Sequence, residues 1–169
     1  MVYSGPARPQ YFGAINDRFV YKNFSLDVNV SYKFDYYFRR SSLNYGSLFS
    51  NGWLGGNAEY AQRWQKPGDE KFTNVPSIIY PDDPSRDTFY EYSSATVEKG
   101  DNIRLQDISL NYSFDKIQYK GLPFNNLQIY VYANNIGILW RANKLHLDPD
   151  YPTGYPSPRS ISLGLKANF

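Results

Sequence analysis

The sequence predicts an all-β fold in which about five antiparallel strands form the C-terminal part of a large transmembrane up-and-down β-barrel. Three observations predict it: an aromatic-rich composition, one long segment of alternating polarity, and connections that are alternately short and long. Tyr (17) and Phe (11) dominate the 18% aromatic content, and such residues favour strands and membrane interfaces. No run approaches the ~20 apolar residues of a membrane helix.

The first two strands are expected at 11–21 and 24–38, joined by a tight turn at Lys22 and Asn23. Every even position of 24–38 is apolar or aromatic and nearly every odd position is polar, which indicates a strand with two unlike faces. At ~3.3 Å per residue it spans roughly 50 Å, enough to cross a ~25 Å apolar band at a tilt of ~40°. Strand 11–21 alternates less regularly.

Three more strands are expected at 103–114, 127–134 and 160–169. The apolar positions of 103–114 change parity midway, and a β-bulge near Gln106 and Asp107 would reconcile its two halves. The other two strands alternate regularly, so each presents one apolar face.

Long loops at 39–102 and 136–159 alternate with short connections. In outer-membrane barrels the outer loops are long and the periplasmic turns are short. We therefore expect both long loops outside the cell and the C-terminus in the periplasm. Such barrels need at least eight strands, so we expect further chain to complete this one. The first residues show no signal-peptide pattern, and we expect either a protein that is not exported or part of a longer one.

Several segments resemble the C-terminal portion of the SusC/RagA family of TonB-dependent transporters. Residues 21–24 (YKNF) are similar to its Tyr-Lys-Gly-Phe hairpin, and 97–112 (VEKGDNIRLQDISLNY) to its acidic-Gly loop, Arg-Leu pair and apolar strand. Residues 132–135 (YANN) resemble its Ala-Gln-Asn-Leu element. Residues 148–150 (DPD) and 154–159 (GYPSPR) resemble its Asp-Pro-Glu and Tyr-Pro-x-Pro-Arg motifs.

The C-terminus resembles the signal by which outer-membrane barrels are recognised for insertion. That signal would comprise Ser162, Gly164 and the terminal Phe169. Ala167 departs from it, because an aromatic or larger apolar residue is usual at that position.

The resemblance implies a bacterial outer-membrane transporter that imports a nutrient such as a glycan or a peptide. It implies as partners a SusD-like lipoprotein, membrane lipid, the rest of the barrel and its plug, and TonB, which would act through a missing N-terminal part. It covers nearly the whole chain but only about the last fifth of such a transporter, so this piece alone is not expected to transport. No cofactor is implied.

Aromatic side chains assigned to the long loops are the candidates for contact with ligand or partner, because aromatic faces suit sugar rings and peptide side chains. These candidates are Trp53, Tyr60, Tyr80, Tyr90, Tyr92 and Trp140. The alternative is that they pack within the loop or against a partner. Trp64 is expected to be structural, since it lies in an element resembling the family's Arg-Trp-x-x-Pro.

Neither catalysis nor a metal site is predicted. His146 is the only histidine and has no Ser or Cys motif around it. The pairs Asp82-Asp83 and Asp148-x-Asp150 lack the spacing of a calcium loop, and nearby prolines favour solvated turns. Net charge is only +2 and forms no basic face, which argues against nucleic acid as a partner.

Two other interpretations fit part of the sequence. A soluble carbohydrate-binding β-sandwich module would bury the even face of 24–38 against a second sheet, but it does not explain the terminal Phe or the loop rhythm. A non-transporting structural barrel or adhesin segment would share the strands. An upstream plug with more alternating strands would favour the transporter, whereas a stop codon and signal peptide would favour the others.

Overall fold

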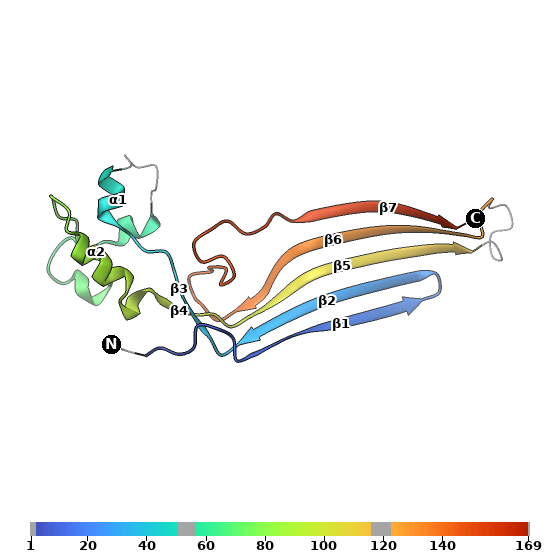
Figure 1. The fold of residues 1–169 in the computed structure, drawn as a ribbon, viewed down its shortest axis with the longest axis horizontal. Helices are drawn as coiled ribbons and strands as arrows, with labels where there is room; N and C mark the ends of the chain where they lie inside the picture. Colours follow the sequence, from blue (N-terminus) through green and yellow to red (C-terminus); the bar gives the residue numbers. More distant parts are fainter. Residues whose placement is uncertain (1–2, 51–56, 116–122, 169) are drawn as a thin grey trace.

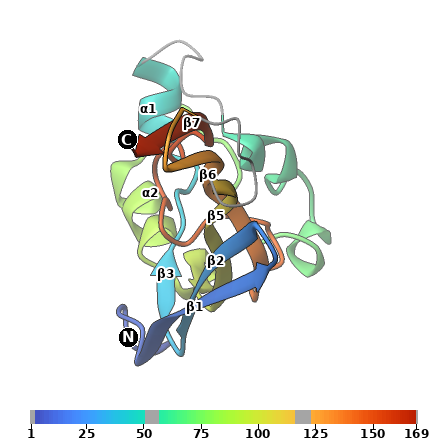
Figure 2. The ribbon, with the colours of Figure 1, turned by 90° about the vertical axis from the view of Figure 1, so that its right-hand side faces the viewer.

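The computed structural model describes residues 3–50, 57–115 and 123–168. Five long strands form one antiparallel sheet in the order β1-β2-β5-β6-β7, which confirms the predicted all-β class. They are β1 (Tyr11–Tyr21), β2 (Phe24–Phe34), β5 (Asn102–Asp115), β6 (Asn126–Arg141) and β7 (Ser160–Asn168). The sheet is open at β1 and β7, and a helical cap lies beyond one end of the strands (Figure 1). Seen along the strands, the sheet is a curved wall (Figure 2).

The hairpin of β1 and β2 is closed by a two-residue turn at Lys22 and Asn23, as predicted. The positive φ belongs to Lys22 (52°), a conformation that costs a side-chain-bearing residue about 1 to 2 kcal/mol. Asn23 donates its side-chain amide to the Ser113 carbonyl at 2.8 Å, and Ser113 N–H donates to the Asn23 carbonyl at 3.0 Å. The turn is thereby tied to β5.

Strand β2 ends at Phe34, so the prediction of one strand over 24–38 is wrong. Asp35 has φ 58° and turns the chain out of the wall, and its N–H donates to the Asp101 carboxylate at 2.8 Å. The chain resumes as β3 (Tyr37–Arg39), which pairs with β4 (Val97–Lys99) in a separate two-stranded sheet. Alternating polarity continues through this break and therefore conceals it.

A β-bulge in β5 confirms the predicted change of parity. Asn29 pairs with Asp107 and the next residue, Val30, pairs with Leu105, so Gln106 is left without an opposite residue in β2. The Gln106 side chain donates instead to the Ser31 hydroxyl at 2.7 Å. The bulge brings the apolar residues of both halves of β5 onto one face.

Strand β6 runs seven residues beyond the predicted 127–134, so the second long loop begins at 142 and not at 136. Asn135 (φ 54°) and Gly137 (φ 141°) interrupt the alternation, which is why the sequence suggested a loop here. Pairing with β5 resumes at Gly137 and continues to Arg141.

We call residues 142–159 the second loop. The short connection at 116–122 and residue 169 lie outside the described residues.

The predicted loop at 39–102 is mostly a folded cap, defined here as residues 40–96. It contains α1 (Tyr45–Ser50), η1 (Ala58–Gln62), η2 (Asp69–Lys71), α2 (Pro84–Glu91) and η3 (Ser94–Thr96). The cap has its own apolar core, made of Leu43, Tyr45, Leu48, Val75 and Tyr90. None of the helices in the described ranges is long and apolar enough to cross a membrane.

Helix α2 begins at a polar N-cap formed by Asp83. The Asp83 carboxylate accepts the Ser85 N–H at 2.9 Å, and Pro84 occupies the first turn, where a missing N–H costs nothing. The hydrogen bond from Ser85 holds the pKa of the Asp83 carboxyl below its usual range. This member of the Asp82-Asp83 pair is thus engaged in local structure.

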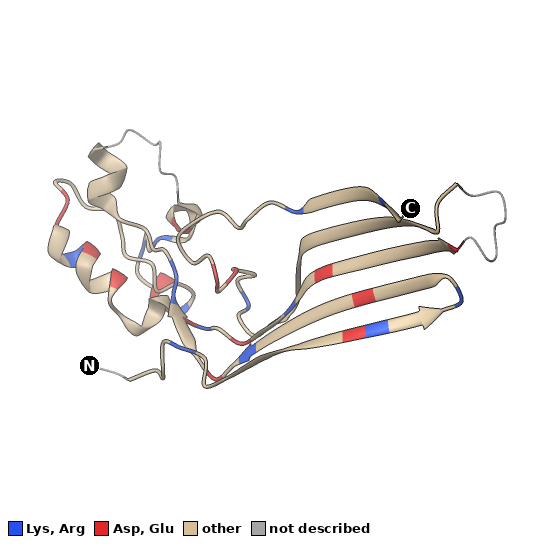
Figure 3. Cartoon of the chain, turned by 45° about the vertical axis from the view of Figure 1, so that its right-hand side comes forward, with Lys and Arg blue, Asp and Glu red and all other residues tan. Residues whose placement is uncertain are grey.

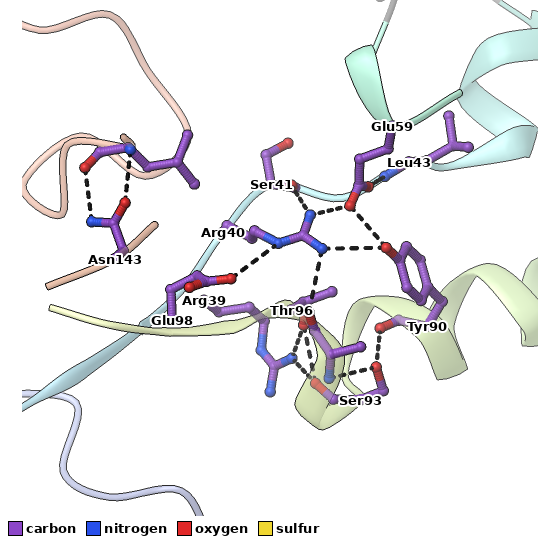
Figure 4. A network of polar contacts seen from close by, with 12 residues as sticks. Arg39, Arg40, Ser41, Leu43, Glu59, Tyr90, Ser93, Thr96, Glu98 and Asn143 are labelled. Atoms are coloured by element: carbon purple, nitrogen blue, oxygen red, sulfur yellow. Dashed lines mark hydrogen bonds and ion pairs between the residues drawn. The ribbon is translucent and has the colours of Figure 1, made fainter. Parts of the chain in front are cut away.

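One polar network fastens the cap to the strand that enters it (Figure 4). The Arg40 guanidinium forms an ion pair with Glu59, and both side chains are almost buried. The Glu59 carboxylate also accepts the Leu43 N–H at 2.7 Å and the Tyr90 hydroxyl at 2.8 Å. Glu59 therefore joins the chain entering the cap, η1 and α2 through one carboxylate.

Removing that carboxylate is expected to open the cap. Glu59→Ala removes the closer carboxylate partner of the largely buried Arg40 and the acceptor of the Tyr90 hydroxyl, leaving Arg40 with Glu98 at 3.8 Å and the Ala95 carbonyl at 3.3 Å. Breaking a buried pair costs up to about 3 to 5 kcal/mol. Native-state hydrogen exchange of cap amides measures the loss. Glu91→Ala is the matched control, because no partner of the Glu91 carboxylate is found within the described residues. Equal exchange in the two variants would show that the network does not hold the cap.

Candidate functional site

One face of the wall is apolar across β2, β5, β6 and β7. Opposite residues of paired strands share a face, and the registers place Leu26 beside Leu110, Leu110 beside Val131, and Val131 beside Leu163. On β7, Ile161, Leu163 and Leu165 of this face are 70 to 78% exposed. The whole apolar set beyond β1 is Leu26, Val28, Val30, Ile103, Leu105, Ile108, Leu110, Leu127, Ile129, Val131, Ala133, Ile161, Leu163, Leu165 and Ala167.

Two aromatic belts bound this apolar face. The turn-side belt contains Phe24 and Tyr112, with ring centroids 4.5 Å apart. The cap-side belt contains Tyr32, Phe34 and Trp140, and the Phe34 and Trp140 rings lie 6.3 Å apart. Ten residues separate Phe24 from Phe34, which at ~3.3 Å per residue and a tilt of ~40° gives a band of about 25 Å. That height matches the apolar layer crossed by outer-membrane barrels.

Trp140 therefore does not lie in a loop, contrary to the prediction. It is part of β6, opposite Ile103 on the apolar face. Its indole contributes to the cap-side belt, where Trp is favoured because one end of the ring is apolar and the other polar.

Strand β1 departs from the pattern at its centre. Asp17 is opposite Val28, so its carboxylate lies on the apolar face, while Phe12 and Val20 lie on the polar one. A carboxylate at mid-height of a barrel wall costs less than a Lys or Arg there. Strand β1 is an edge strand of the described sheet, so this position adjoins its unpaired side.

The opposite face of the wall is polar and internally hydrogen-bonded. Arg18 forms an ion pair with Asp27, the Asn111 amide donates to Asp27 at 3.3 Å, and the Gln128 amide donates to Asn111 at 3.2 Å. This row crosses β1, β2, β5 and β6. Such a face suits a water-filled lumen, because an apolar core would leave these groups unsatisfied.

The second loop is anchored to the polar face by ion pairs. Arg104, on β5, contacts Asp148 at 2.5 Å and Asp150 at 3.4 Å, and Lys33, on β2, contacts Asp150 at 2.6 Å. Buried Asn143 shapes the loop by exchanging two hydrogen bonds with the backbone of Leu147 (Figure 4). The solvated turn predicted at Asp148-x-Asp150 is instead ion-paired to the wall. Charged residues are sparse along the strands and gather toward this end (Figure 3).

The aromatic candidates that lie in the cap differ in exposure: two are packed in the cap and two are exposed. Tyr90 is only 4% exposed, and its burial raises the pKa of its hydroxyl. Tyr60 packs against the core with Arg63 over its ring at 4.1 Å. Tyr80 and Tyr92, by contrast, are 86% and 67% exposed. Trp53 lies outside the described residues.

Trp64 is held within the cap by two hydrogen bonds. Its indole N–H donates to the Glu70 carboxylate at 3.1 Å, and its backbone N–H donates to the Val75 carbonyl at 3.0 Å.

Sequence reasoning missed Phe89, which projects from α2 near Tyr92. Phe89 is 79% exposed, and both rings line a groove of about 870 Å³ between α2, β3 and the segment at residues 3–7. Their spacing of three residues places them on the same side of a helical segment. That spacing was the available signal, had 84–91 been recognised as a helix.

The predicted insertion signal is only partly described. Ser162 and Gly164 lie on the polar face of β7, opposite Tyr132 and Tyr130, and Phe169 lies outside the described residues. A Cβ added at Gly164 would overlap the Tyr130 ring, so the ring lies across this glycine. Within the described ranges, no group of three or more His, Asp or Glu side chains could hold a metal ion.

Comparisons with known proteins agree with a transporter barrel fold. No family model matches the chain. The curated protein TonB-dependent receptor P26 of Formosa agariphila is 28% identical over 183 residues, covering 86% of this chain. The RagAB peptide importer superposes with a TM-score of 0.66 in its open-open state and 0.65 in its closed-closed state. Each match has 17% identity and covers 99% of this chain. The chain spans only 17 to 18% of these relatives' lengths.

The two faces predict opposite tolerance to charge. Val28→Arg or Val30→Arg places a cation near the middle of the apolar band, which costs about 2 to 4 kcal/mol in lipid. The side chain of residue 29 lies on the polar face, where the Asn29 amide donates to the Asp107 carboxylate at 3.0 Å. Asn29→Arg is therefore expected to be tolerated. Heat-modifiable migration and protease resistance of the complete protein in outer membranes measure assembly. Equal assembly at both parities would contradict a lipid-facing apolar side.

Proposed function

We propose, on the premise that this chain is a segment of a SusC/RagA-like TonB-dependent transporter, that it forms part of the outer-membrane wall and the cell-surface cap of a nutrient importer. The observation that carries this proposal is the apolar band between two aromatic belts, on a sheet whose other face is polar. A β-sandwich would need a second sheet to cover that apolar face.

The loop lengths support a cap outside the cell. The cap and the second loop lie at one end of the wall, while the turn at Lys22 and the end of β7 lie at the other (Figure 1). Barrels of this class keep their short turns and C-terminus in the periplasm. The cap therefore faces the medium, where a nutrient first arrives.

A glycan or a peptide is the proposed nutrient, and a SusD-like lipoprotein is the proposed partner at the cell surface. The support is the fold shared with a peptide importer, together with the exposed rings of Tyr80, Phe89 and Tyr92 on the cap. Exposed aromatic rings rimmed by polar groups are typical of binding surfaces. TonB and the plug would act through chain outside this sequence. We propose no catalytic role and no cofactor.

The topology predicts which end reacts with a reagent that cannot cross the membrane. This chain contains no cysteine, so single cysteines can be introduced into a cysteine-free complete transporter. Phe72→Cys, at a cap residue that is 89% exposed, is expected to react with a maleimide of this kind on intact cells. Lys22→Cys, in the opposite turn, is expected to react only after the outer membrane is broken. The reverse pattern would invert the proposed topology.

Nutrient import is tested by growth. Cells that lack the complete transporter are supplied with the wild-type gene or with Val28→Arg, and glycans or peptides serve in turn as the limiting nutrient. Growth on one nutrient class is expected to fail with Val28→Arg and to be restored by the wild type and by Asn29→Arg. Unchanged growth of the deletion strain on every glycan and peptide would count against import of either class.

A further inference from the structure

We propose that a basic pocket between the second loop and the cap-side end of the wall binds a carboxylate group of the nutrient. The pocket has a volume of about 400 Å³ and is lined by Arg104 of β5, Arg141 of β6 and Arg159 at the end of the second loop. That volume fits a single sugar or amino-acid residue rather than a whole chain. The inference rests on the proposed transporter function, because it requires that nutrient reach the polar face.

The charges of the pocket are not balanced. Among its lining residues described by the structure, three guanidinium groups face one carboxylate, that of Asp148. Asp150 also approaches Arg104, but its nearer partner is Lys33. The four cations thus share two carboxylates, which leaves positive charge available to an anion.

All three arginines have donors without acceptors. Arg104 is 4% exposed, and its Nε has no hydrogen-bond partner. Arg159 makes no hydrogen bond or ion pair with any residue in the described part of the chain, and its guanidinium lies beside Gly137. Arg141 uses one nitrogen on the His146 carbonyl and keeps others free. The free donors of Arg141 and Arg159 are open to an acceptor that enters the pocket, whereas the Arg104 Nε is enclosed by protein.

A carboxylate matches these donors better than a neutral ligand does. Guanidinium groups present paired N–H donors that fit the two oxygens of a carboxylate. Arg104 is held by Asp148 and Asp150, so its position is fixed before ligand arrives. The carboxylate could belong to an acidic peptide or to a glycan containing uronic acid, and the two sources share the same chemistry at the pocket.

Binding to the purified complete transporter in detergent separates these sources. The probes are a Glu-containing oligopeptide and an oligogalacturonate, each compared by calorimetry with a neutral counterpart, the Gln peptide or the methyl-esterified oligosaccharide. One acidic probe is expected to bind at least tenfold more tightly than its counterpart, with an advantage that declines as salt is raised. No preference for either acidic probe would overturn the proposal.

Variants that remove single charges test whether the preference for acidic probes arises in this pocket. Arg159→Gln is expected to abolish most of the acidic preference while leaving binding of the neutral counterpart unchanged. Arg18→Gln, which removes a polar-face arginine paired to Asp27 far from the pocket, is the control and is expected to retain the preference. An unaltered preference in Arg159→Gln would remove the pocket from consideration. Surface labelling of Phe72→Cys on intact cells, before the transporter is purified from them, tests the topology separately, so failure of the pocket and failure of the transporter assignment are distinguishable.

Discussion

The register between β2 and β5 is the constraint on which the rest of the wall depends. Side chains alternate with a period of two, so a slip of one residue would move the whole apolar set to the polar side. The bulge at Gln106 inserts one residue and keeps Ile103 and Ile108 on the same face despite their opposite parity. Without it, the cap-side half of β5 would place Arg104 on the apolar face and lose its contact with Asp148.

The same register links the apolar band to the cap and the second loop. Because Arg104 and Lys33 point to the polar face, the second loop folds over that side and not over the apolar face. At Asp35 the chain leaves the sheet, and Tyr36 is buried where β3 begins and β4 ends, its hydroxyl accepting from Asn102 at 2.9 Å. The cap is therefore attached at the border between the cap-side belt and the polar end of the wall.

Most features of the wall could be predicted from the alternation of polar and apolar residues along the sequence. The others depend on contacts between residues far apart in the sequence. The hairpin, the face of each strand and the bulge followed from periodicity, because each depends on neighbours one or two residues apart. The end of β2 did not, because a left-handed Asp35 leaves the polarity pattern intact. The extension of β6 was hidden by the opposite cause, since Asn135 and Gly137 break the pattern while pairing continues.

The cap core and the proposed basic pocket were the features least predictable from the sequence. The cap core unites Leu43, Val75 and Tyr90, and the basic pocket unites Arg104, Arg141 and Arg159, so no local motif indicates either. Aromatic content alone could not separate the buried Tyr90 from the exposed Tyr92.

Spin-label accessibility along β6 tests the central claim most directly. Labels placed one at a time from Leu127 to Asn134 in the complete protein, reconstituted in lipid, are probed with oxygen, which partitions into lipid, and with a water-soluble nickel complex. Oxygen accessibility is predicted to peak at Leu127, Ile129, Val131 and Ala133, and nickel accessibility at the residues between them. Uniform accessibility, or peaks of the opposite parity, would contradict the assignment of the apolar face to lipid.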